Sequence, residues 1–359
     1  MVRWDGRRWR WIALVACVAL VGYLVAWPVP IDPIAWQPPV APALTGELAP
    51  NQQLNNADVV AVVGEGPEDV VLGPDGVWYS GLLDGRIVRV LPGQRGAEDF
   101  VSTGGRPLGL AFADDGSLLV ADAKRGLLRV DRDGEIEVLV DEVEGTPVLF
   151  ADEVAIAPDG TVWFTDASTR FGVDDYLTDA LESRPTGRLV AFDPATGTAR
   201  IALAGLHFAN GVAVAHDGAS VFVAETFSYR ITRFWVTGEK AGTSEPFAVN
   251  LPGFPDNITL GESGTLWVAL AAPRNALLDR LGPHPWARKV VARLPSAVRP
   301  KPARYGLVLG LGADGSVQHN LHDPSGRWAM LTSAVPIGDV LALGSLHGHA
   351  IGRVPLPTN

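Results

Sequence analysis

Four oxygen-bearing side chains recur in one register along the chain. Each lies seven residues before a polar turn residue that glycine follows, just ahead of a short apolar run. The positions are Glu68, Asp152, Asn210 and Asp256, and their turn residues are Asp75, Asp159, Asp217 and Ser263. Calcium takes about six to eight oxygen ligands and tolerates irregular geometry, so these four could share one ion if the fold brings them together. Alternatively, each side chain satisfies backbone donors at its own strand.

Histidine and cysteine offer no competing site. Zinc prefers nitrogen and sulfur ligands, but the seven histidines share no comparable register. The single cysteine, Cys17, lies in an apolar N-terminal run and excludes an intramolecular disulfide. The pattern therefore favours an oxygen-ligated ion.

Such side chains converge only if their elements are arranged radially, and an internal repeat supports that arrangement. The unit GPDGVWYSGLLDGRIVRV begins at Gly73, ADDGSLLVADAKRGLLRV at Ala113 and APDGTVWFTDAS at Ala157. Each contains an Asp-Gly turn between apolar runs, which is a hairpin signal. Successive turns are 40, 44, 58 and 46 residues apart, and propeller blades take about 40 to 50 residues each.

We therefore predict an all-β fold, a six-bladed β-propeller over residues 58–358. A degenerate sixth unit covers residues 328–355. The apolar segment 58–63 has no blade of its own, so we expect it to form the outer strand of the last blade. This strand would close the ring and remove open sheet edges.

The N-terminus predicts a membrane anchor. Residues 1–10 hold four arginines and one aspartate, and residues 11–27 form an uncharged apolar run. Its length is near the lower limit for crossing a bilayer, and the basic flank should stay in the cytoplasm. We expect a single-pass signal-anchor with the propeller on the extracytoplasmic side; a cleaved secretory signal is the alternative. Residues 28–57, rich in Pro, Ala and Asn, are expected to form a linker.

The charge distribution limits the partners. The net charge is −11 although the first ten residues are basic, and an acidic body does not suit a phosphate backbone. Residues 272–304 depart from the body, with eight basic residues and one acid, Asp279, at amphipathic helical spacing. We predict a helical insertion in blade five that lies on anionic lipid or forms a lid. A solvated basic helix on the propeller rim is the plain alternative.

Several segments in order resemble the strictosidine synthase-like and gluconolactonase superfamily. They are GRPLGLAF from Gly105, WFTDAST from Trp163, FANGVAV from Phe208, GFPDNI from Gly253 and LHDPSG from Leu321. The resemblance implies a propeller that binds calcium at the mouth of its central channel. It carries the ligand roles to Glu68, Asp152, Asn210 and Asp256, and adds Asn257 as a weaker ligand.

The resemblance also implies what this chain lacks. Leu108 stands where related lactonases of the paraoxonase type keep a catalytic histidine. Residues 330–338 hold no acid, whereas strictosidine synthases use a glutamate of the last blade for amine-aldehyde condensation. Condensation is therefore the least supported activity.

The remaining route is metal-assisted hydrolysis of an ester or lactone, in which calcium polarises the carbonyl and a base accepts a proton from water. In an up-and-down blade the second strand ends where the innermost strand begins, which places Asp122, Asp166 and Glu225 near the metal. We predict them as candidate bases, with turn capping as the alternative role of each. A non-enzymatic propeller that calcium stabilises is the second function hypothesis, since both would use the same ligands.

Overall fold

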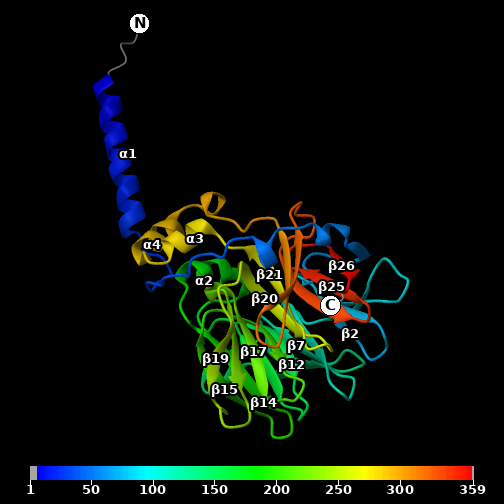
Figure 1. The fold of residues 1–359 in the computed structure, drawn as a ribbon. Coiled ribbons are helices and arrows are strands. Elements are labelled where there is room, and N and C mark those ends of the chain that lie inside the picture. Colours follow the sequence, from blue (N-terminus) through cyan, green and yellow to red (C-terminus); the bar gives the residue numbers. More distant parts are fainter. Residues whose placement is uncertain (1–5, 358–359) are drawn as a thin grey trace.

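The computed structural model describes residues 6–357, and six four-stranded antiparallel sheets are arranged in a ring in this part of the chain (Figure 1). Strand order within each of the first five sheets follows the sequence, as in an up-and-down blade. The sheets face one another around a central channel. The predicted six-bladed β-propeller is confirmed.

The blades have the following strands, from the innermost outward. Blade one has β2 (Val71–Leu72), β3 (Trp78–Gly81), β4 (Arg86–Val90) and β5 (Glu98–Ser102). Blade two has β6 (Pro107–Phe112), β7 (Leu118–Asp122), β8 (Gly126–Val130) and β9 (Ile136–Val140). Blade three has β12 (Ala151–Ile156), β13 (Val162–Asp166), β14 (Gly187–Asp193) and β15 (Thr198–Leu206). A small hairpin, β10 (Glu142–Val143) and β11 (Thr146–Pro147), precedes it.

Blade four has β16 (Ala209–Val214), β17 (Ser220–Glu225), β18 (Arg230–Trp235) and β19 (Ser244–Ala248). Blade five has β20 (Gly253–Leu260), β21 (Leu266–Pro273), β22 (Gly306–Leu311) and β23 (Val317–Asp323). Blade six has β24 (Leu331–Ile337), β25 (Val340–Ser345), β26 (Ala350–Pro355) and, from the N-terminal side, β1 (Asp58–Val62).

Strand β1 closes the ring. It pairs antiparallel with β26, with Asp58 opposite Arg353 and Val62 opposite Ala350. The last blade is thus built from both ends of the propeller sequence, as its leftover apolar strand indicated. Closure leaves no blade with an unfinished edge and ties the two chain ends together.

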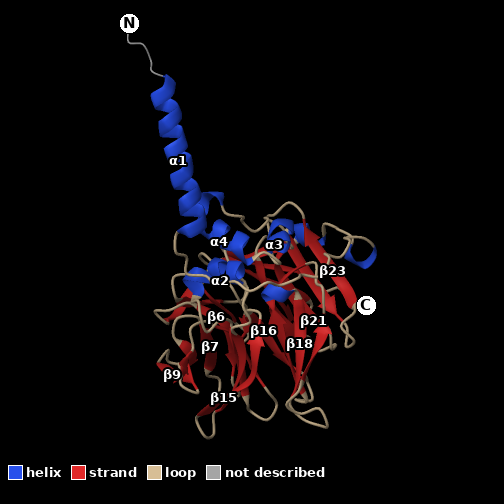
Figure 2. Cartoon of the chain, turned by 90° about the vertical axis from the view of Figure 1, so that its left-hand side faces the viewer, coloured by secondary structure: helices blue, strands red, loops and turns tan. Residues whose placement is uncertain are grey.

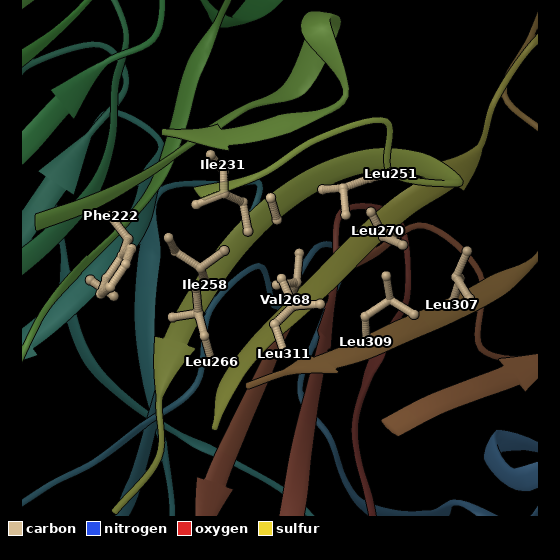
Figure 3. Close-up of a cluster of buried hydrophobic side chains, with 13 residues drawn as sticks. Phe222, Ile231, Leu251, Ile258, Leu266, Val268, Leu270, Leu307, Leu309 and Leu311 are labelled. Atoms are coloured by element: carbon tan, nitrogen blue, oxygen red, sulfur yellow. The ribbon is translucent and has the colours of Figure 1, made fainter. Parts of the chain in front are cut away.

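The core consists of apolar layers between neighbouring blades. In the layer between blades four and five, Phe222 and Ile231 pack with Leu266 and Val268 (Figure 3). These strands read as nearly continuous apolar runs because both faces of a blade contact a neighbour. Each blade is therefore held in place by the two beside it.

Two helical insertions lie at one end of the propeller. The first contains η3 (Val173–Asp175) and α2 (Tyr176–Glu182) and joins β13 to β14. The second contains α3 (Ala276–Leu281), α4 (Pro285–Arg293) and η5 (Ser296–Val298) and joins β21 to β22 (Figure 2). The predicted helical insertion in blade five is present. We call this end the insertion face and the opposite end, which carries turns such as that at Asp159, the turn face.

Residues 28–57 do not form the free linker that their composition suggested. They run over the insertion face and then along blade five, where η1 (Gly46–Leu48) and η2 (Gln53–Asn56) contact β23. Ile31 is 3% exposed and Leu54 is fully buried. The backbone is held too, since Trp36 N donates to Gly282 O at 3.1 Å. A few anchoring contacts, without any periodic pattern, fix this segment.

Helix α1 (Gly6–Ala26) projects from the insertion face (Figure 1). Its residues 7–26 are long and apolar enough to cross a membrane, and none of that span is buried in the protein. At ~1.5 Å per residue the helix is about 30 Å long. It is a candidate membrane anchor, although residues 1–5 of the predicted basic flank lie outside the described residues.

Leu54→Ala tests whether the N-terminal segment is part of the folded body. Truncating this fully buried side chain should lower the free energy of unfolding by about 2–5 kcal/mol, because a cavity opens beneath blade five. Chemical denaturation of the detergent-solubilised chain measures the change. Leu44→Ala, at a site 42% exposed in the same segment, is the matched control and should have little effect. Equal small effects would mean that the segment is not anchored.

Candidate metal centre

A recurring β-bulge contains four of the five predicted ligands. The innermost strand of each of blades two to five shifts its register near its start, with the shifts between Pro107 and Leu110, Ala151 and Val154, Ala209 and Val212, and Pro255 and Ile258. The residues inside the bulges include Leu108, Asp152, Asn210, Asp256 and Asn257. A bulge adds an unpaired residue and redirects its side chain. The seven-residue register thus coincides with a repeated backbone irregularity at Asp152, Asn210 and Asp256, whereas Glu68 lies in the loop before β2.

The five predicted ligands come together around the channel mouth. Asn257 Nδ2 donates to both carboxylate oxygens of Glu68, at 3.1 and 3.2 Å, although the residues are 189 positions apart. Each of the five is at most 7% exposed. Burial raises the pKa of Glu68 well above its usual value, and the nearby carboxylates of Asp256 and Asp152 raise it further. The ring therefore gathers acidic side chains in a buried space.

Asp256 and Asp152 share this environment. Burial raises the pKa of Asp256 to about 7, against a lowering hydrogen bond from the Asn210 side chain. The pKa of Asp152 is also raised, by burial first and by Asp256 second. Without a cation, these carboxyls favour the protonated form because the charged form loses its hydration.

Two amide oxygens of the centre are buried without a hydrogen-bond donor. Oδ1 of Asn210 and Oδ1 of Asn257 are buried and have no hydrogen-bond partner. An unpaired buried acceptor costs about 1–3 kcal/mol, so it calls for a donor or a cation. No three histidine, cysteine, aspartate or glutamate side chains within residues 6–357 already surround one metal position. An ion here would be shared by carboxylates and amides together, and that donor set fits calcium.

Close backbone approach makes room for the ring. A Cβ on Gly211, the residue after Asn210, would lie 2.5 Å from Ile258 N and 2.6 Å from Asp256 O. Glycine is required because the innermost strands of blades four and five nearly touch there. That contact brings Asn210 to Asp256.

Arg106 is a component of the centre that the sequence did not reveal as one. It is 1% exposed, and its Nη1 donates to Gly66 O at 3.0 Å. Its charge lowers the pKa of Glu68 and Asp152, so it partly offsets their repulsion. Nε and Nη2 have no partner within the described structure. The only available signal was an arginine inside the otherwise apolar GRPLGLAF segment.

Blade six contributes a hydroxyl group to the centre, at the blade where strictosidine synthases use a glutamate. The bulge between Leu331 and Ser333 contains Thr332, whose hydroxyl donates to the backbone oxygen of Glu68 at 2.6 Å. Ser333 donates to the same oxygen at 3.0 Å. These bonds hold Glu68, which precedes β2, against the last blade.

The three candidate bases share one structural role. Each ends a second strand and accepts a backbone N–H from the loop before the innermost strand of its own blade. The pairs are Asp122 with Arg106 N at 3.0 Å, Asp166 with Phe150 N at 2.9 Å, and Glu225 with His207 N at 2.9 Å. Turn capping is thus present at all three positions.

Only one of the three keeps a free oxygen. Asp166 is paired with Arg188 at 2.9 Å, and Glu225 accepts two bonds from Arg230 at 2.6 and 2.9 Å. Oδ2 of Asp122 is buried without a partner. Asp122 also interacts electrostatically with the Arg106 guanidinium, and the same guanidinium interacts with Glu68 and Asp152. Asp122 is the candidate base that the arrangement leaves available.

An apolar cover lies over the mouth on the insertion face. Leu108 packs in a cluster with Phe150, Phe208 and Phe227, and Tyr176 and Ala180 of α2 contact this cluster. The rings are in direct contact, with Phe208 and Phe227 centroids 4.6 Å apart. Access from this face therefore requires the cover to move.

A cavity of about 220 Å³ lies on the other side of the ring, inside the channel. It is lined by Asp69 and Glu153, the neighbours of two predicted ligands. Asp69 Oδ2 accepts from Leu110 N at 3.2 Å, and burial raises its pKa to about 6. Asp69 and Glu153 therefore face the channel interior.

The fold and the ring of oxygen donors define a class: a six-bladed β-propeller with a candidate cation centre at its channel mouth. The strictosidine synthase family model matches residues 152–239, and the N-terminal model of strictosidine synthase-like proteins matches residues 46–90. Protein strictosidine synthase-like 6 of Arabidopsis thaliana is 35% identical over 301 residues, covering 79% of this chain and 78% of its own. The chain belongs to the strictosidine synthase-like family.

A further relative matches almost the whole chain. Human adipocyte plasma membrane-associated protein is 33% identical over 374 residues, covering 96% of this chain and 88% of its own. Among solved structures, a gluconolactonase from Xanthomonas campestris has a TM-score of 0.62 at 17% identity, with 92% and 99% of the two chains covered. Regucalcin from Agrobacterium tumefaciens, described as a calcium-binding protein, has a TM-score of 0.59 at 15% identity, covering 83% and 92%. These structures establish the fold alone.

The raised pKa of Asp256 predicts how calcium acts on stability. This carboxyl is protonated in the metal-free protein below about pH 7 and charged above it. Because its folded pKa exceeds the unfolded one, the metal-free protein loses stability as the pH rises toward 7, and calcium should compensate above that. Melting temperatures of metal-free and calcium-loaded protein at pH 5.5 to 8.5 test this. The calcium-induced increase should grow with pH.

Asp256→Asn provides the matched variant. It removes the buried charge, so it should raise the metal-free melting temperature at pH 8 and abolish the calcium response. Asp159→Ala, at an exposed turn of blade three, removes only a local acceptor for Thr161 N and should leave the calcium response unchanged. A calcium response that survives in Asp256→Asn, or that weakens toward alkaline pH, would contradict the assignment.

Proposed function

We propose that the chain is a calcium-dependent hydrolase of esters or lactones. The observation that carries this is the pair of unpartnered amide oxygens, from Asn210 and Asn257, within a ring of three buried carboxyls. That donor set suits a hard cation. The description of one neighbouring structure as a gluconolactonase and of another as calcium-binding supports the same class.

Glu68, Asp152, Asn210, Asp256 and Asn257 would hold the ion. Bound there, calcium would polarise a substrate carbonyl and stabilise the negative charge that develops on its oxygen. On binding, the Asn257 amide would have to release the Glu68 carboxylate and present its oxygen instead.

Asp122 is the proposed general base. Its Oδ1 accepts from Arg106 N at 3.0 Å and Lys124 N at 2.9 Å, which fixes the carboxylate, while Oδ2 remains free to accept a proton from water. Asp166 and Glu225 have their oxygens engaged by arginines and act as clamps of the site loops.

The apolar cover favours substrates with an apolar part. Leu108 and the phenylalanines around it contribute no polar group, so they would exclude bulk water and contact an acyl or aryl group. Helix α2 must shift for access. It is held by Arg170, which pairs with Glu182 at 2.8 Å, and by Arg288, which donates to Glu182 O at 2.9 Å.

The closed cover also favours a second candidate, a non-enzymatic propeller in which calcium is structural. In that case chelation destabilises the protein and no ester is hydrolysed. Amine-aldehyde condensation has less support, because β24 carries Thr332 and Ser333 toward Glu68 and holds no carboxylate.

The anchor would set the orientation. We propose that α1 crosses the membrane with the arginines of residues 1–10 in the cytoplasm and the propeller on the extracytoplasmic side. Support comes from the basic flank before the apolar helix and from the projection of α1 away from the body.

Hydrolysis by the full chain tests the proposed activity. A panel of aryl esters and lactones should be turned over in the presence of calcium, with activity lost on chelation and restored by calcium. Asp256→Ala should lose both activity and the calcium-induced increase in melting temperature.

Asp122→Asn separates chemistry from structure. It keeps an acceptor for Arg106 N but removes the base, so kcat should fall about 10²–10⁴-fold while the calcium response of the melting temperature persists. Asp166→Asn is the matched control, since it weakens the Arg188 pair and should lower stability more than kcat. No turnover in any wild-type assay, with an intact calcium response, would select the structural role instead.

A further inference from the structure

The second insertion is fixed to the end of the anchor helix. Tyr23 Oη donates to Arg293 O at 3.0 Å, while Arg293 donates through Nε to Trp27 O at 2.6 Å and through Nη1 to Leu24 O at 3.0 Å. A cation on the last carbonyls of a helix stabilises its C-terminus. Helix α4 therefore lies where α1 leaves the body, and a bilayer that contains α1 must begin beside it.

Large apolar side chains of this insertion face outward. Trp286 is 70% exposed, Val298 is 64% exposed and Leu277 is 49% exposed. They come from α4, η5 and α3, which lie together on the side of the body from which α1 projects (Figures 1 and 2). Tryptophan at such a position is typical of a membrane interface, where one part of the ring is apolar and the other is wet.

The same insertion is basic on an acidic protein. Some of its cations have internal partners: Arg274 pairs with Asp279 at 3.0 Å, and Arg288 is buried. Arg280 and Lys301 are exposed. The whole chain carries a net charge of −11, so these cations stand out from an acidic body and would attract an anionic surface.

We propose that Leu277, Arg280, Trp286, Val298 and Lys301 form a docking platform for the anionic lipid headgroups of the bilayer that α1 enters. Trp286 and Val298 insert at the headgroup boundary, and Arg280 and Lys301 contact lipid phosphates. The occupant follows from continuity with the anchor, since α1 delivers a bilayer to this surface and to no other. This inference is independent of any hydrolytic activity.

The experiment uses the full chain in liposomes. Cys17→Ser removes the single native cysteine, and Trp286→Cys or Val298→Cys then provides one labelling site for an environment-sensitive fluorophore. Asp159→Cys, on the turn face, is the control site. Quenching by lipids spin-labelled near the headgroup is compared in zwitterionic vesicles and in vesicles with about a third of anionic lipid.

We expect several-fold stronger quenching at positions 286 and 298 than at 159, and a further increase with anionic lipid. Arg280→Glu with Lys301→Glu should remove that increase. Arg95→Glu with Arg200→Glu, the same charge change at exposed arginines outside the insertion, should not. Melting curves check that each variant is folded.

Quenching at 286 and 298 no greater than at 159 would overturn the proposal and make the insertion a solvated helix. Quenching that appears only when a second protein is added would assign the surface to a protein partner, which also contradicts it. The quenching experiment does not measure ester hydrolysis, so its result is independent of whether the protein is a hydrolase.

Discussion

Closure of the ring is the constraint on which the rest of this structure depends. Strand β1 pairs with β26 and completes blade six from both ends of the propeller sequence. Only in a closed ring does the loop before β2 meet the start of β20, so the hydrogen bond between Glu68 and Asn257 is itself a consequence of closure. Thr332 and Ser333 reinforce the same junction by holding Glu68 O from the last blade. The candidate centre and the junction that closes the propeller are thus one region.

The sequence predicted what repetition encodes. Blade number follows from a pattern that recurs, and the apolar segment left without a blade indicated the closing strand. Asp152, Asn210 and Asp256 lie in bulges that recur with this pattern, and their role as ligands stays a prediction. The sequence could not predict features that occur only once in the chain and so form no pattern. Ile31 and Leu54 anchor a segment whose composition resembles a linker, because two buried side chains leave no periodic signal. Arg106 was missed for a similar reason, since a buried arginine is recognisable only when the carboxylates around it are known.

The candidate bases show where spacing alone misleads about chemistry. Asp122, Asp166 and Glu225 were selected because the second strand ends near the metal, and the same position makes each of them the acceptor for a loop N–H. Geometry cannot distinguish a clamp from a base, but partners can. Arginines complete the hydrogen bonding of Asp166 and Glu225, and Asp122 alone retains an open oxygen. The ion is similarly better supported than the reaction, because unpaired amide oxygens indicate a ligand without indicating a substrate.

The arrangement of the insertion face connects the membrane to the centre through few contacts. Arg293 joins α4 to the end of α1. Arg288 of the same helix donates to the backbone oxygen of Glu182, the last residue of α2. Helix α2 in turn contacts the phenylalanine cluster over Leu108. These helices are short, so each derives its position from packing on its neighbours. A surface that binds α4 would therefore act on the same body of helices that covers the channel mouth. An apolar substrate dissolved in that bilayer would meet the cover first.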